Sequence, residues 1–95
     1  MSICTYHCRL LNLPHTILPR KHISFKLEHK TIIGHASFDG SVFKMFADDK
    51  YNDIINNIIE NGGGFSHAGN FDMDGDFVLS EISVTKSPRY KSEVL

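Results

Sequence analysis

The segment from Asn70 to Glu81, NFDMDGDFVLSE, holds the densest set of side chains in this chain that could perform chemistry. Oxygen-bearing residues fall at its first, third, fifth, seventh and twelfth positions, and a glycine falls at the sixth. These residues are Asn70, Asp72, Asp74, Asp76 and Glu81, with Gly75 as the glycine. A calcium-binding loop requires oxygen ligands at such positions, a glycine for the sharp turn and a closing glutamate. The spacing therefore marks a candidate calcium site.

A complete EF-hand also needs a helix on each side of its loop, and the flanking sequence does not provide them. The preceding helical pattern ends at Gly62, and the β-branched run after Glu81 leads to Pro88. A β-hairpin accounts for the same residues, because Asp74-Gly75 suits a type I′ turn between apolar segments. We therefore predict a hairpin here and keep a calcium-binding domain as an alternative.

The string Phe71-Asp72-Met73-Asp74-Gly75, extended by Ser80-Glu81, resembles motif one of the haloacid dehalogenase-like phosphatases. The resemblance implies that Asp72 would be the nucleophile and Asp74 the acid/base. That family places the motif near its start, at the end of a buried parallel strand of a large α/β core. Only 14 residues follow Glu81 in this chain. We infer no homology, and we expect a protein that is not an enzyme.

Cysteine and histidine side chains offer a second metal hypothesis, a zinc site formed by Cys4, Cys8, His15 and His22. The gaps between the last three residues do not match a familiar zinc finger. In an extended strand the two cysteines would lie roughly 13 Å apart, which is too far for a disulfide. We expect reduced, buried cysteines, as is usual in the cytoplasm. We also expect no bound metal and no cofactor.

The composition is that of one soluble domain of 95 residues, 41% apolar and 22% charged, with a formal net charge of -1. This charge gives no global field that would attract nucleic acid or a membrane surface. Two local basic clusters, Arg20-Lys21-His22 and Lys86 to Lys91, leave a small nucleic-acid-binding protein as another alternative. No apolar run is long enough to span a bilayer, and we expect a cytoplasmic protein.

One helix is clearly encoded, between Asp48 and Gly62. Tyr51, Ile54, Ile55, Ile58 and Ile59 recur at the spacing of a single helical face. An aspartate at the start can cap the first turn, and the glycine can end the last turn in a left-handed conformation. This helix must pack its isoleucine face against a sheet.

Strand patterns occupy most of the remaining chain. The expected strands are Ile3 to Leu13, Ile23 to Leu27, Ile32 to Phe38, Ser41 to Phe46, and two strands around Asp74-Gly75. Pro14 and Pro19 predict an irregular connection that completes an N-terminal region of residues 1–21, and residues 86–95 are expected to form a mobile tail. The predicted fold is α+β, with an antiparallel sheet of about five to six strands in the order βββ(β)αββ and the amphipathic helix on one face.

The two turns also predict the register of the hairpins. A type I′ turn at Asp39-Gly40 would place Phe38 opposite Ser41 and Ala36 opposite Phe43. With one face of the sheet on the helix, the other face would then be semi-apolar. Its residues would be Ile33, His35, Val42, Lys44, Phe46, Phe77 and Leu79, with Asp72 and Glu81 among them.

Contiguous apolar patches of this kind mark contacts with other proteins. We therefore expect a small non-enzymatic protein-binding module that acts as a regulator, an inhibitor or an immunity-type protein. Its partner would be another protein or a second copy of itself.

Overall fold

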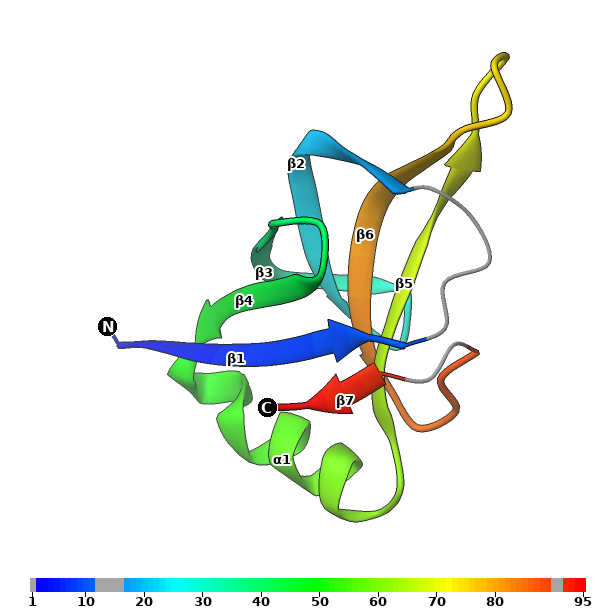
Figure 1. The fold of residues 1–95 in the computed structure, drawn as a ribbon. Helices are drawn as coiled ribbons and strands as arrows, with labels where there is room; N and C mark the ends of the chain where they lie inside the picture. The colour runs from blue at the N-terminus through cyan, green and yellow to red at the C-terminus, as the bar shows by residue number, and fades with distance from the viewer. Residues whose placement is uncertain (1, 12–16, 90–91) are drawn as a thin grey trace.

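The chain folds as a small α+β domain, with a curled seven-stranded sheet and one short helix (Figure 1). The computed structural model describes residues 2–11, 17–89 and 92–95, with the backbone alone at 17–21. The strands are β1 Ile3–Leu10, β2 Ile17–Leu27, β3 Thr31–Phe38, β4 Val42–Asp48, β5 Gly64–Phe71, β6 Phe77–Thr85 and β7 Ser92–Val94. A 3₁₀ turn, Asp49–Tyr51, leads into helix α1, Asn52–Glu60.

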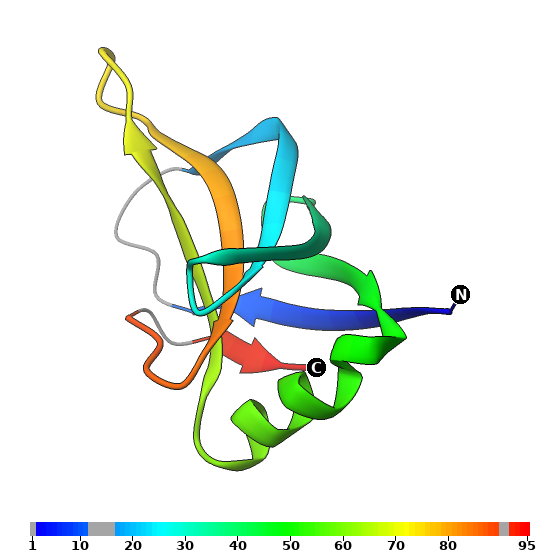
Figure 2. The same cartoon turned by 180° about the vertical axis from the view of Figure 1, so that it is seen from behind.

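The strand order in the sheet is β5-β6-β2-β3-β4-β1-β7. Neighbouring strands are antiparallel except β2 and β6, which are parallel. The α+β prediction is confirmed, but the sheet is larger than predicted and mixed. The physical reason is that the β1–β4 strands and the β5–β6 hairpin would each expose an unpaired edge, and the β2–β6 contact covers both. The sheet curls into a half-barrel (Figure 2).

The predicted helix is present and closes the end of the half-barrel that lies opposite the tip of the β5–β6 hairpin (Figure 1). The Asp48 carboxylate accepts a hydrogen bond from the Lys50 amide at 3.0 Å, which lowers the pKa of that carboxyl group. Gly62 ends the helix with φ of +92°. Ile55 and Ile58 are buried. In the described part of the chain, no helix is long and apolar enough to cross a membrane.

Both ends of the chain contribute more strand than predicted. β2 begins at Ile17 and includes Pro19, so the prediction of an irregular connection is wrong for residues 17–19. The proline is tolerated because the pairing of β2 with β3 begins only at Ile23, so Pro19 lies where one edge of β2 has no ladder that needs its N–H. Within the expected tail, Ser92–Val94 forms β7 and pairs with β1.

The first hairpin turns one residue later than predicted. Phe38 lies opposite Phe43 and Ala36 opposite Met45. The cause is Asp39, whose carboxylate accepts hydrogen bonds from the amides of Val42 at 2.8 Å and Ser41 at 2.9 Å. These bonds lower the pKa of Asp39. They also hold Asp39 at the position before the turn rather than at the centre of the turn.

A β-bulge interrupts the pairing of β3 with β2. Gly34 lies opposite Phe25 and Ile32 opposite Lys26, so Ile33 is an extra residue without a partner in β2. An extra residue reverses the inward and outward alternation of a strand. Ile33 is consequently turned into the core and is 5% exposed, whereas Ile32 points outward and is 63% exposed.

A second bulge lies in β6. Ala68 of β5 is opposite Glu81, but the next residue, Gly69, is opposite Leu79, which leaves Ser80 as the extra residue. A type I′ turn centred on Asp74-Gly75 predicts a register with Ala68 opposite Glu81, and this register is confirmed from Glu81 to Thr85 but is wrong between Phe77 and Leu79. Beyond the bulge Leu79 and Phe77 point inward, at 0% and 7% exposure.

The core fills the concave side of the curled sheet. Tyr6, Phe25 and Phe65 form an aromatic cluster with ring centroids 6.1 to 6.4 Å apart. The hydroxyl group of Ser92 donates a hydrogen bond to the Phe65 carbonyl at 2.9 Å and so links the two edge strands. Cys4 and Cys8 are free thiols, as predicted. Burial raises the pKa of the Cys8 thiol to about 12 and keeps it protonated.

The packing of α1 leads to a first prediction. Replacing the fully buried Ile55 by alanine should lower the free energy of unfolding by about 2 to 5 kcal/mol, because apolar contacts are lost and a cavity is left. Ile54 is adjacent but 42% exposed, so Ile54→Ala serves as the matched control and should cost less than about 1 kcal/mol. Urea unfolding followed by circular dichroism measures both. Equal losses would show that the helix does not pack in this orientation.

Candidate functional site

The predicted partner face is only partly present on the outer, convex side of the sheet. His35 and Lys44 are exposed there, and Val42 and Phe46 are half-buried. The other three apolar members, Ile33, Phe77 and Leu79, belong to the core. Their predicted exposure is wrong, because the bulges in β3 and β6 turn them to the concave side. The described residues therefore do not form the broad semi-apolar surface that was predicted.

What remains of that face is a small cluster around Phe46. The His35 ring stacks on the Phe46 ring, with centroids 5.0 Å apart and an angle of 22°. The ammonium group of Lys44 lies 5.6 Å from the centre of the same ring. Side chains of its own domain thus already cover Phe46. This ring is therefore less suited to anchor a partner protein.

The residues of the candidate calcium loop do not converge on one point. An Asp72 carboxylate oxygen accepts hydrogen bonds from the amides of Asp74 and Asp76, each at 2.9 Å, and so stabilises the hairpin turn. Asn70 pairs with Val78 within the sheet. Glu81 points elsewhere, with a carboxylate oxygen 3.4 Å from His29 Nδ1 and 3.8 Å from Lys26 Nζ. No cluster of metal-binding side chains occurs among the described residues.

The residues of the other metal and nucleic-acid hypotheses are spread over the fold. Cys4 and Cys8 are four residues apart on β1, and Cys8 is fully buried in the core. His22 is exposed on β2, and His15 lies outside the described residues. The cluster Arg20-Lys21-His22 falls on β2, with the first two side chains not described, so the nucleic-acid hypothesis stays a prediction.

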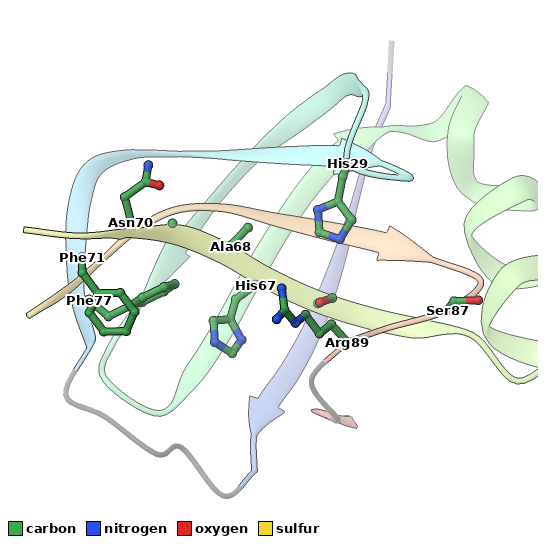
Figure 3. Close-up of a pocket in the computed structure, with 10 residues that line it drawn as sticks. His29, His67, Ala68, Asn70, Phe71, Phe77, Ser87 and Arg89 are labelled. Atoms are coloured by element: carbon green, nitrogen blue, oxygen red, sulfur yellow. The ribbon is translucent and has the colours of Figure 1, made fainter.

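A groove of about 530 Å³ lies along β5 (Figure 3). Its described lining consists of His29, Ser66, His67, Ala68, Gly69, Asn70, Phe71, Phe77, Ser87 and Arg89. The volume is in the range that accommodates a small ligand or several side chains of a peptide. Sequence patterns did not indicate this groove.

The groove runs along the edge of β5 rather than over one face of the sheet. It is lined by six consecutive residues, Ser66 to Phe71, and consecutive strand residues point to opposite faces. Figure 3 shows His67 and Phe71 on one side of the strand and Ala68 and Asn70 on the other. A cavity that touches both sets must lie beside the strand. β5 is also the first strand in the sheet order, with its other edge paired to β6.

Backbone groups of β5 also point outward along this edge. The Phe65 carbonyl accepts the hydrogen bond from Ser92, which lies on the side away from β6. Outward and inward backbone groups alternate along a regular strand, and this alternation would also direct the N–H and C=O of Gly69, four residues further on, away from β6. A Cβ on Gly69 would collide with the Val78 carbonyl oxygen. Gly69 also lines the groove, and it has no side chain that could cover its own backbone.

The side chains of the groove differ between its two ends. At one end the Phe71 and Phe77 rings meet edge to face, with centroids 5.3 Å apart and an angle of 73°. The His67 ring meets Phe77 at 5.8 Å and 88°. Toward the other end the lining is polar, and Figure 3 shows the side chain of Arg89 directed toward β5 near His67.

The polar end is rich in hydrogen-bond donors. The Ser66 hydroxyl group is 1% exposed and has no hydrogen-bond partner among the described residues. Ser87 and Arg89 come from the segment after β6, and His29 comes from the turn between β2 and β3. Among the described lining residues there is no aspartate or glutamate. The Glu81 carboxylate lies 3.4 Å from His29 Nδ1, so the part of this end beside Arg89 is the part suited to an anionic group.

Comparisons with protein-family models, with curated proteins and with solved structures found no match for this chain. The function must therefore be inferred from the geometry and chemistry of the groove. A sequence signal for the groove does exist in retrospect, because Leu79 and Ile82 are three residues apart in a strand. This odd spacing of two core residues is a sign of the bulge that shapes the groove.

The hydrogen bonds of the hairpin turn lead to a second prediction. Asp72→Ala should lower the free energy of unfolding by about 1 kcal/mol, because two turn amides lose their acceptor. Asp74→Ala is the control and should change it by less than about 0.5 kcal/mol, since only its backbone takes part in these bonds. The melting temperature of each protein is measured with and without millimolar calcium. Stabilisation of the unsubstituted protein by calcium, lost in both variants, would instead support the calcium loop.

Proposed function

We propose that this protein is a small non-enzymatic binding module that receives an extended segment of another protein along the outer edge of β5. The observation that carries this proposal is the groove lined by six consecutive residues of an edge strand. The function keeps the protein-binding role predicted from the sequence and moves it from the convex face to the strand edge.

Edge strands are suited to this task because their outward backbone groups can pair with a further strand. In peptide recognition by strand addition, the backbone hydrogen bonds supply affinity and the pockets for alternate side chains supply specificity. The groove offers both elements, with the backbone of Gly69 at its centre and side-chain pockets at its ends.

The other candidate surfaces of this molecule are less suited to binding an extended peptide. β7 is the other edge strand, but it is only three residues long. On the convex face the Phe46 ring is covered by His35 and Lys44. Natural edges are commonly protected by charged side chains, prolines or bulges on the outer strand, and Ser66 to Phe71 contains no charged residue or proline.

The test is selection of linear peptides from a random phage-displayed library on the immobilised protein, followed by amide chemical-shift mapping of the tightest binder. We expect the largest shifts at Ser66 to Phe71, and we expect the Gly69 amide to exchange with solvent at least about tenfold more slowly, because it gains a hydrogen bond. Lys44→Ala on the convex face serves as the matched control and should bind like the unsubstituted protein. Failure to select any peptide, or shifts centred on Lys44 and Phe46, would contradict the proposal.

A further inference from the structure

The chemistry of the groove restricts the segment that it can receive. Building on the proposed function, we infer that the ligand is an extended peptide that carries a carboxylate side chain and, four residues away, a large apolar or aromatic side chain. The carboxylate binds at the polar end of the groove and the apolar side chain covers Phe71.

The polar end provides the recognition of the carboxylate. Arg89 supplies a guanidinium group, whose paired N–H donors match the two oxygens of a carboxylate. His29 also lines the groove, with its Nδ1 3.4 Å from a Glu81 carboxylate oxygen.

The aromatic end provides the recognition of the apolar side chain. Phe71 is 62% exposed although its ring packs edge to face on the buried Phe77. A ligand side chain laid on the exposed part of Phe71 removes apolar area of both partners from water. Phe77 holds the Phe71 ring in position and so reduces the ordering cost of binding.

The distance between the two ends sets the spacing in the ligand. Arg89 approaches β5 near His67 (Figure 3), and Phe71 is four residues from His67 on the same side of the strand. Four residues of extended chain span about 13 Å. A paired ligand strand has the same rise, so its two anchoring side chains must also be four residues apart. A spacing of three would put them on opposite faces.

The test uses two blocked, fluorescein-labelled peptides of identical composition, Ser-Glu-Thr-Val-Thr-Phe-Ser and Ser-Glu-Thr-Val-Phe-Thr-Ser. Fluorescence anisotropy measures their affinities at about 50 and 300 mM salt. The first peptide, with glutamate and phenylalanine four residues apart, should bind about tenfold more tightly than the second. Its affinity should fall at the higher salt concentration.

Two variants test which end of the groove binds the carboxylate and which end binds the apolar side chain. Arg89→Gln should weaken the first peptide about fivefold and reduce the effect of salt, and Phe71→Ala should weaken it about fivefold without changing the effect of salt. Arg9→Gln is the matched control and should leave binding unchanged. Arg9 of β1 pairs with Glu93 of β7, and neither is among the described residues that line the groove.

The outcomes separate this inference from the proposed function. If both peptides bind equally and the amide shifts still map to β5, the carboxylate and spacing rule is overturned while strand addition stands. If neither peptide binds but the phage selection yields peptides without an acidic residue, the rule is likewise overturned. If neither the designed peptides nor the selection gives a ligand at β5, both proposals fail.

Discussion

The architecture of this protein depends on one extra residue in β6. Ser80 is not matched by any residue of β5, and the strand alternation reverses at that point. Ile82 and Val84, which follow the bulge in the sequence, face the core, and Leu79 and Phe77, which precede it, also face the core. An unbroken strand would turn only one of these pairs inward. The bulge thus lets a single strand supply the core over its whole length and bends the sheet so that it curls around that core.

The same bulge shapes the groove. With Phe77 turned inward, its ring lies under Phe71 and beside His67, which builds the aromatic end of the binding surface. The parallel contact of β2 with β6 then decides that β5, rather than β6, forms the edge of the sheet. Core packing and the proposed recognition site therefore have a common origin in the way β6 is placed.

Several elements could be predicted from the sequence because their causes are local. The isoleucine spacing specifies the helix, Asp48 caps the 3₁₀ turn that leads into it, and the left-handed Gly62 ends it. The positions of both hairpins were also predictable from Asp-Gly pairs. The bulges and the parallel β2–β6 contact depend on packing between segments that are far apart in the chain. The alternation of apolar and polar residues within one segment carries no information about such packing. The groove was missed for the same reason, since a strand edge is defined only once the strand order is known.

The orientation of β6 beyond Ser80 is the claim on which both the fold and the groove depend, and neighbouring residues test it directly. Leu79 is fully buried and Val78 is half-buried on the opposite side. Leu79→Ala should therefore lower the free energy of unfolding by about 2 to 5 kcal/mol and Val78→Ala by less than about 1 kcal/mol, measured by urea denaturation. A strand without the bulge requires the opposite order, and a larger loss at Val78 than at Leu79 would contradict the account.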